Sequence, residues 1–169
     1  MSDAPARPCV RWAITMTTGT DTNPVTLREV TAENVRSVCE LKLADGQERY
    51  VAPSSYTVAE AAYDPGSWLR AIYCGDSIVG VLDLTTTELG DGSRPFLVRL
   101  LVDRDHQRRG LGRAAIERLV DHLRSVAGTT ALETSCVPGP GSPRDFYLRL
   151  GFGDTGRVEH GEQVLSYSL

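Results

Sequence analysis

The stretch DRDHQRRGLGR, residues 103–113, gathers residue types that can bind a multiply charged anion. Gly110 and Gly112 have no side chain, so successive backbone N–H groups around them can point at one oxyanion. A helix pattern begins at the same place, and a helix N-terminus carries about half a positive charge. Arginines beside such a bend can add charge-assisted hydrogen bonds to further phosphate oxygens. We therefore predict a pyrophosphate site here, and its basic residues are Arg108, Arg109 and Arg113.

Two regular elements must hold this stretch in place. The apolar run FLVRLLVD, residues 96–103, is typical of a strand at the centre of a sheet and leads directly into the stretch. From Gly110 onward, apolar residues recur at helical spacing, which predicts a helix with one buried face that Gly128 ends. The apolar positions are Leu111, Ala115, Ile116, Leu119, Val120 and Leu123.

The segment before this unit predicts a strand and two helices. Residues 25–30 alternate with the period of a strand, and Thr31 is the expected N-cap of the helix that follows. Thr57 and Glu60 have the capping-box spacing, which predicts the start of a second, shorter helix. The apolar face of the first helix includes Val35, Val38 and Cys39.

The remaining segments predict hairpins, one more strand and one more helix. Residues 68–84 form two β-prone runs around a tight turn, and a polar loop covers 85–95. The later elements are a strand at 130–137, a loop at 138–143, a short helix ended by Gly151 and a hairpin that turns at His160–Gly161.

Other interpretations of the glycine-rich stretch fit less well. A solvated connection does not explain the concentration of arginine. Gly110, Gly112 and Ala115 match the G-x-G-x-x-A pattern of dinucleotide folds, but there the glycines follow the strand almost at once, and too little chain follows for the remaining parallel strands. RNA binding is disfavoured because no aromatic residues interleave with the arginines, and because the net charge is −4.

Two motifs resemble one known family. Residues 107–112, QRRGLG, match the Q/R-x-x-G-x-G/A signature of the GNAT superfamily of N-acetyltransferases, in which this loop grips the pyrophosphate of acetyl-CoA. FYLRLGF, residues 146–152, is similar to the late segment of that family, where a tyrosine precedes a Gly-Phe pair. The order of elements over residues 25–169 is also similar to the family's arrangement. The resemblance implies an α/β (α+β) fold with a mixed, mostly antiparallel central sheet flanked by helices.

The resemblance also implies site residues. Tyr147 corresponds to the general acid of the family, although Phe146 and Tyr147 could both be packing residues. Backbone N–H groups of the central strand would hold the acetyl group, which implicates Leu101 and Val102. The implied acetyl-CoA-binding residues are Leu101, Val102, Gln107, Arg108, Arg109, Gly110, Leu111, Gly112 and Arg113.

The acceptor amine must lose a proton before it attacks a thioester, because an aliphatic ammonium has a pKa of about 10. The candidate carboxylates are Glu48, Asp83 and Glu133, and a chain of water molecules is the alternative. The family often has an asparagine after the strand at 130–137. This chain has Pro140 near that position, so Ser142 is the candidate substitute.

Residues 33–63 resemble the bacterial spermine/spermidine (polyamine or diamine) acetyltransferases. The parallel consists of Gln47, Tyr50, Val51 and Ala52, followed by the helix from Thr57 to Glu60. Carboxylates that could line a pocket for a polycation are Glu48, Glu60, Asp64 and Asp83. A cationic antibiotic would suit the same carboxylates. A non-catalytic acyl-CoA sensor is the alternative from another class.

Composition limits the remaining possibilities. The chain has 41% hydrophobic and 24% charged residues, no run long enough to span a membrane and no convincing signal peptide, so we expect a cytoplasmic protein. Its four cysteines and three histidines lack metal-ligand spacing, so we expect no metal and no disulfide framework. Residues 1–23 are expected to be a flexible extension and residues 24–169 an N-acetyltransferase domain. The expected partner is a small amine, with no nucleic acid and no membrane, and a homodimer is left open.

Overall fold

The computed structural model describes residues 24–85 and 94–169. The predicted extension, residues 1–23, and residues 86–93 of the predicted polar loop lie outside the described residues. In the part of the chain that is described, no helix is long and apolar enough to cross a membrane.

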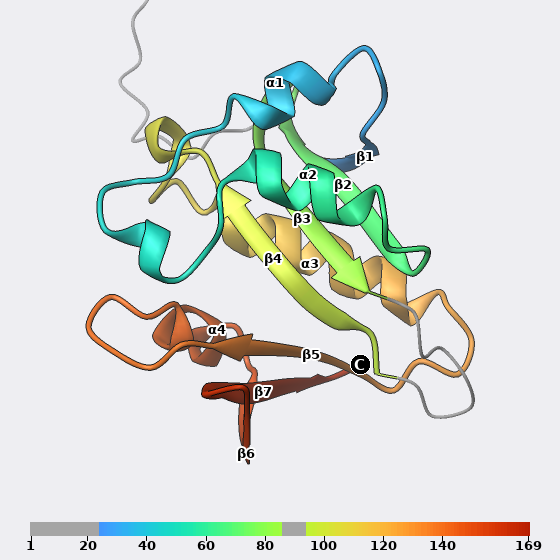
Figure 1. The fold of residues 1–169 in the computed structure, drawn as a ribbon. Helices are drawn as coiled ribbons and strands as arrows, with labels where there is room; N and C mark the ends of the chain where they lie inside the picture. The colour runs from blue at the N-terminus through green and yellow to red at the C-terminus, as the bar shows by residue number, and fades with distance from the viewer. Residues whose placement is uncertain (1–23, 86–93) are drawn as a thin grey trace, which may run out of the picture.

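A seven-stranded sheet organises the molecule, with strand order β1-β2-β3-β4-β5-β7-β6 (Figure 1). All neighbours pair antiparallel except β4 and β5, which are parallel. The sheet is therefore mixed and mostly antiparallel, as predicted, and the apolar strand β4 lies at its centre. The strands are β1 Val25–Glu29, β2 Ser67–Cys74, β3 Ser77–Thr85, β4 Phe96–Val102, β5 Ala131–Cys136, β6 Gly153–Glu159 and β7 Glu162–Ser168.

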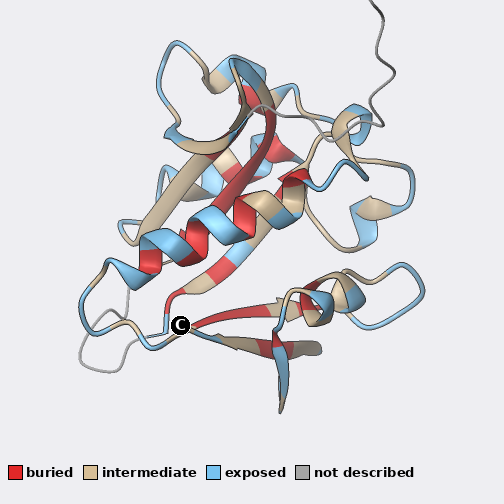
Figure 2. Cartoon of the chain, turned by 180° about the vertical axis from the view of Figure 1, so that it is seen from behind, coloured by how far each residue is buried: buried red, intermediate tan, exposed pale blue. Residues whose placement is uncertain are grey.

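Helices cover both faces of the first four strands. The helix α3 crosses the back of the sheet and turns its buried positions toward the strands (Figure 2). All six predicted apolar positions of α3 are buried, because their helical spacing places them on one face. On the other face, α1 and α2 cover a smaller cluster that contains Val38, Ala71, Val81 and Leu101. The helices are α1 Val35–Cys39, α2 Ser54–Ala61, α3 Leu111–Arg124 and α4 Arg144–Arg149, and the 3₁₀ turns are η1 Gln47–Arg49 and η2 Arg104–His106.

The central strands β4 and β5 separate shortly after they meet. They pair only at Phe96 with Glu133 and at Leu97 with Thr134. Beyond these pairs β4 runs up and away from β5, which leaves a gap between the two strands (Figure 1). Backbone groups of β4 that face this gap have no ladder partner on β5, so they are available to a ligand.

Three predicted helix boundaries were wrong. The first helix begins at Val35 after Asn34, because Thr31 belongs to the preceding turn, where its carbonyl accepts the Val35 N–H at 2.9 Å. The second helix begins at Ser54, so Thr57 is a buried interior residue and not a cap.

The third wrong boundary is the end of the signature helix. The helix α3 ends at Arg124, where the Ser125 hydroxyl and N–H both donate to the His122 carbonyl. Gly128 lies in the turn beyond, with φ +84°.

The two predicted hairpins are confirmed, since β2–β3 turns at Gly75–Asp76 and β6–β7 turns at His160–Gly161.

Gly80 is required where β3 approaches β4. A Cβ at this position would lie 2.4 Å from the carbonyl oxygen of Leu101, which is backbone and cannot move aside cheaply. We expect Gly80→Ala to lower the free energy of unfolding by about 1–3 kcal/mol, measured by urea denaturation. Gly153→Ala is the matched control, because its Cβ would lie 3.8 Å from the Ser166 carbonyl oxygen, an ordinary contact. Equal stability of the two variants would contradict this account.

Candidate active site

The loop between β4 and α3 has the conformation of an anion-binding nest. Arg108 and Gly110 both have left-handed backbones, with φ +61° and +79°. Such residues alternating with ordinary ones turn neighbouring N–H groups toward one point. The first N–H groups of α3 add to this set, because the first turn of a helix has no intrahelical acceptor for them. The predicted glycine bend is therefore present at Gly110, and the nest extends to a position, Arg108, where no glycine indicated it.

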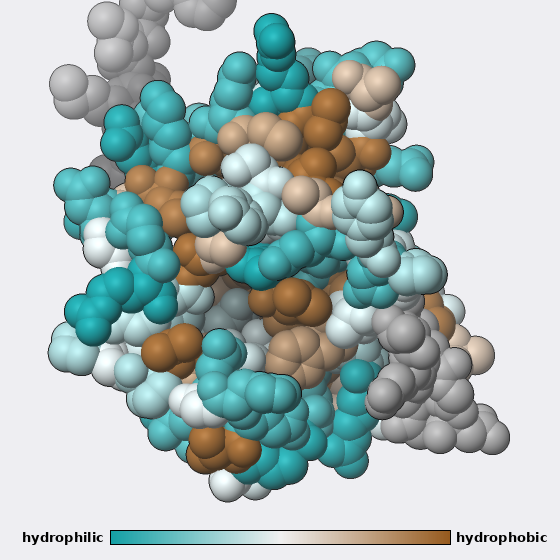
Figure 3. All heavy atoms as spheres, in the orientation of Figure 1, coloured by the Kyte–Doolittle hydropathy of each residue, from teal (hydrophilic) through white to brown (hydrophobic). Residues whose placement is uncertain are grey.

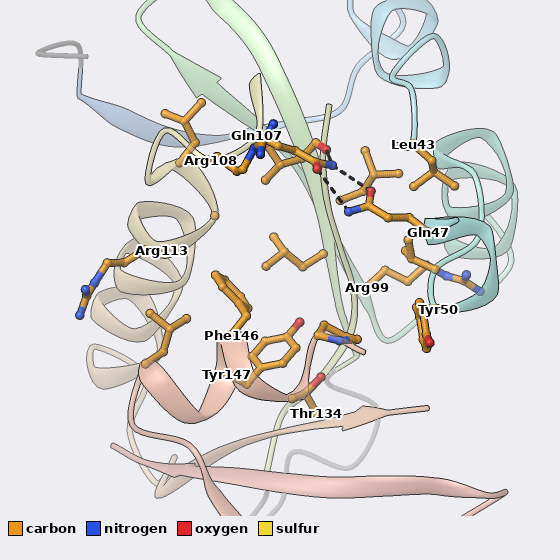
Figure 4. Close-up of a pocket in the computed structure, with 18 of the residues that line it drawn as sticks. Leu43, Gln47, Tyr50, Arg99, Gln107, Arg108, Arg113, Thr134, Phe146 and Tyr147 are labelled. Atoms are coloured by element: carbon orange, nitrogen blue, oxygen red, sulfur yellow. Dashed lines mark hydrogen bonds between the residues drawn. The ribbon is translucent and has the colours of Figure 1, made fainter. Parts of the chain in front are cut away.

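One cavity of about 590 Å³ opens beside this loop, between the two halves of the sheet (Figure 4). The surface is hollowed over the gap between β4 and β5 (Figure 3). Of the predicted site residues, Leu101, Val102, Gln107, Arg108, Gly110, Leu111, Gly112, Arg113 and Tyr147 line the cavity. Arg109 is exposed on the loop and does not line it. The structure thus brings together, around one cavity, predicted residues from two segments that lie far apart along the chain.

Gln107 holds the loop in place. Its Nε2 donates to the Val102 carbonyl at 2.9 Å and to Oε1 of Gln47 at 2.8 Å. The Gln47 amide donates back to Oε1 of Gln107 at 3.2 Å (Figure 4). The side chain is therefore engaged with the protein itself, and only the backbone of Gln107 remains available to the predicted anion.

The main chain of β4 presents alternate residues to the gap. The Asp103 N–H donates to the Val79 carbonyl at 2.9 Å, so the N–H groups at every second residue before it also face β3. Leu101 is one of these residues, and its side chain is buried in the cluster under α1 and α2. The N–H groups that face β5 are those of Leu100 and Val102. The prediction for the Leu101 N–H was wrong by one residue, because antiparallel pairing with β3 already uses that side of the strand.

Tyr147 sits on α4 on the opposite wall of the cavity, only 6% exposed. Its ring packs edge-on between Phe146 and Phe152, with centroids 5.1 and 5.2 Å away. Gly151, with φ +100°, lets the chain turn so that the Phe152 N–H returns to the Tyr147 carbonyl. This turn explains the Tyr…Gly-Phe spacing. Tyr147 is therefore a packing residue that also faces the cavity.

The surroundings of Tyr147 keep its hydroxyl protonated. Burial raises the pKa of Tyr147 well above its ordinary value, and the neighbouring Cys136 thiol raises it further, against a smaller opposing effect of a hydrogen bond with Thr134. Burial also raises the pKa of Cys136, to about 11. Both groups are neutral at physiological pH, so this wall of the cavity carries no negative charge.

Comparison with known proteins decides the family. The model of the Acetyltransferase (GNAT) family matches residues 35–152. The chain belongs to the GNAT family. A spermine/spermidine N(1)-acetyltransferase of Bacillus subtilis is 22% identical over 151 residues, which cover 86% of this chain and 99% of the relative.

Solved GNAT structures share the fold. An acetyltransferase from Thermus thermophilus has a TM-score of 0.63 and 20% identity, over 86% of this chain and 97% of that chain. The PaiA N-acetyltransferase from Thermoplasma acidophilum, solved in complex with coenzyme A, has a TM-score of 0.63 and 9% identity, over 86% of this chain and 99% of that chain. These structures show the shared fold, and the family match makes the chain a GNAT-type N-acetyltransferase. Acetyl-CoA is the acetyl donor of this family.

The signature loop fits the pyrophosphate of that donor. A Cβ at Gly110 would meet no atom within 4 Å, so the space beside Gly110 is open. Arg108 and Arg113 both line the cavity, but the Arg113 guanidinium pairs with Glu117 on α3 at 3.1 Å. The groups that could donate to phosphate oxygens here are therefore mainly backbone N–H groups, with Arg108 beside them.

The three candidate carboxylates do not line the cavity. Glu48 is exposed on η1, and Glu133 is buried but pairs with Arg94 at 2.9 Å and with Arg157. Asp83 is buried on the α2 side of the sheet, where burial raises its pKa and the Ser67 hydroxyl donates to it. None of the lining residues in the described ranges is an aspartate or a glutamate. His106 does line the cavity, and its place directly before the signature glutamine was the signal that sequence reasoning missed.

In the loop at 138–143, Ser142 does not take the place expected for the family's asparagine. Oγ of Ser142 accepts the Arg144 N–H at 3.4 Å, and Ser142 does not line the cavity. The Pro140 carbonyl accepts a hydrogen bond from the Tyr50 hydroxyl. In the described part of the chain no group of three or more His, Cys, Asp or Glu residues could hold a metal ion.

Gly112 tests the approach to the nest. A Cβ at Gly112 would lie 3.4 Å from the Phe146 ring and 3.6 Å from Val102, so alanine fits but a larger side chain fills the slot between them. We expect Gly112→Leu to weaken acetyl-CoA binding by at least about tenfold, which is about 1.4 kcal/mol, measured by calorimetry. Gly112→Ala is the graded control and should change the Kd much less. An unchanged Kd for the leucine variant would count against the nest as the phosphate site.

Proposed function

We propose that this GNAT acetyltransferase transfers an acetyl group to a primary amine of a small acceptor in the cavity between β4 and β5, with Tyr147 as the general acid. Bound acetyl-CoA supplies the activated thioester. The observation that carries the proposal is that Tyr147 and the free N–H side of β4 face one cavity whose far end is the nest.

The chain divides the work among three groups of atoms. Backbone N–H groups around Gly110 hold the pyrophosphate, so the thioester end is directed into the gap. The N–H groups of Leu100 and Val102 can donate to a carbonyl oxygen as negative charge develops on it. The Tyr147 hydroxyl protonates the departing thiolate, whose parent thiol has a pKa of about 8.5 in water. The raised pKa of Tyr147 keeps the hydroxyl protonated before the transfer. The proton that the attacking amine loses on becoming an amide then restores the Tyr147 hydroxyl.

The amine proton is assigned to water. The described lining contains no carboxylate, and Glu48, Asp83 and Glu133 all lie outside it. At pH 7 about one part in a thousand of an aliphatic amine is neutral. Water in the mouth of the cavity is a sufficient acceptor for the proton, and His106 is the lining residue that could assist it.

The acceptor that we propose is a polyamine. Support comes from the two curated relatives, both spermine acetyltransferases that match 86% of this chain. A second cavity, lined in part by Glu159 and Glu162, shares Ser135 with the first and offers carboxylates to a distant ammonium group. The charge of Arg99, which lines the first cavity, is offset by its ion pair with Glu60.

The cytoplasm is the proposed location of this reaction, and cell fractionation tests it. Both a homodimer and a monomer are compatible with the proposal, and sedimentation equilibrium distinguishes the two.

An amine panel tests the proposed function. We expect release of CoA thiol from acetyl-CoA with spermidine and spermine, and weaker release with an aminoglycoside, because its rings fill more space than a linear chain. Cadaverine and n-pentylamine form a matched pair that differs in the second ammonium group, and cadaverine should have the lower KM. Binding of acetyl-CoA with no thiol release for any amine would identify a sensor instead. A preference for the aminoglycoside would replace the polyamine by a cationic antibiotic.

Tyr147→Phe tests the general acid. We expect kcat to fall by about a hundredfold or more, with the Kd for acetyl-CoA changed less than about threefold, because the ring packing is kept and the proton donor is lost. In the wild type, kcat should not decline between about pH 7 and pH 10, because the raised pKa keeps Tyr147 protonated over that range. A phenylalanine variant with wild-type kcat at every pH would remove Tyr147 from catalysis.

A further inference from the structure

The two halves of the sheet are joined by hydrogen bonds gathered at one end of the cleft. The Glu133 N–H donates to the Pro95 carbonyl at 3.0 Å, and the Thr134 hydroxyl donates to the Leu97 carbonyl at 2.9 Å. Arg94 pairs with Glu133 at the same end. These bonds lie beside the short parallel pairing of β4 and β5, so they hold the two walls of the cleft together at that end. The spacing of the walls at the open end must be set by other contacts.

The turn η1 spans that open end. Gln47 and Tyr50 are three residues apart, and side chains at this spacing leave a 3₁₀ turn on the same side. Gln47 exchanges two amide hydrogen bonds with Gln107 on the wall that carries the signature loop. The Tyr50 hydroxyl donates to the Pro140 carbonyl on the wall that carries α4. The two side chains thus connect the two walls through a single turn. Figure 4 shows the hydrogen bonds between Gln47 and Gln107.

The loop on the second wall is shaped around Tyr50. Gly139 and Gly141 have φ +141° and +86°. A Cβ at Gly139 would lie 3.2 Å from the Tyr50 hydroxyl, and one at Gly141 would lie 3.7 Å from its ring. The same loop leads directly into α4, where the Tyr147 N–H donates to the Pro143 carbonyl at 3.2 Å. A shift of this loop therefore moves the start of the helix that carries Tyr147.

We propose that Tyr50 is a positioning residue for the transfer reaction: its bond to Pro140 sets the opening of the cleft and thereby the distance between Tyr147 and the main chain of β4. Gln47 anchors the turn from which Tyr50 reaches across. This inference rests on the proposed function, because the effect of Tyr50 on the reaction depends on the position of Tyr147. It assigns a role to the Gln47–Tyr50 spacing that the transfer chemistry does not otherwise use.

Tyr50→Phe is the sharpest variant, because it keeps the ring between Gly139 and Gly141 and removes only the hydroxyl. We expect kcat to fall by about tenfold, the loss of about one hydrogen bond, while the Kd for acetyl-CoA stays within about twofold because the nest belongs to the other wall. The matched control is Tyr56→Phe, on the exposed side of α2 with 63% of the residue exposed. Wild-type kcat in Tyr50→Phe would overturn the proposal.

A double-mutant cycle separates positioning from a general loss of structure. If Tyr50 acts through Tyr147, Tyr50→Phe should have no further effect on kcat in the Tyr147→Phe background. An equal loss of kcat in both backgrounds would mean that Tyr50 acts elsewhere and would overturn the assignment.

Hydrogen exchange gives a readout that does not need activity. The Ser142 N–H donates to the Gly139 carbonyl at 3.1 Å inside the loop, so its exchange reports on the loop. We expect faster exchange over residues 139–144 in Tyr50→Phe and none of this change in Tyr56→Phe. If the wild type acetylates no amine, the proposed function fails, but hydrogen exchange still tests whether the bond from Tyr50 to Pro140 holds the loop. Unchanged exchange in Tyr50→Phe would overturn this role of the Tyr50–Pro140 bond even in an active enzyme.

Discussion

The separation of β4 from β5 is the constraint on which the site depends. A strand in the middle of a sheet normally has its N–H and C=O groups paired on both sides, and burying such groups without partners costs free energy. Here the parallel pairing stops after Leu97, so one side of β4 is left open toward a cavity. The unpaired side becomes a row of preoriented donors at no further cost when a ligand binds.

The loop that follows this strand carries backbone strain that neighbouring contacts must balance. A non-glycine residue in the left-handed region, such as Arg108, costs of order 1–3 kcal/mol. The hydrogen bonds of the Gln107 amide to Val102 and Gln47 contribute about 0.5–1.5 kcal/mol each, which is enough to offset that strain. The signature glutamine therefore has a structural explanation: it stabilises a backbone shape that Gly110 alone would not fix.

How much of the structure could be predicted depends on how far apart along the sequence the interacting residues lie. The apolar strand β4, the amphipathic helix α3 and the turn at Gly151 are written in local patterns, and all three were predicted. The bond from Tyr50 to Pro140 joins residues 90 apart, and nothing local marks it. Thr57 failed as a cap because Ser54, three residues earlier, is buried against the carbonyl of Cys39 and starts the helix.

The candidate carboxylates lie outside the cavity, and Glu133 illustrates why. Glu133 was selected for its place on β5, but buried carboxylates are retained where cations meet them, and Arg94 and Arg157 approach it from distant segments.

The effect of burial then depends on which form of a group is useful. In the proposed reaction, the raised pKa of Tyr147 keeps the hydroxyl protonated before the thiolate departs. For Asp83, a raised pKa favours a neutral acid on the other face of the sheet. The described lining of the cavity has no carboxylate to accept a proton, which leaves His106 and water for that task. The acceptor amine must therefore arrive neutral or lose its proton at the mouth, and the protein's contribution to the rate lies in the positions of its walls.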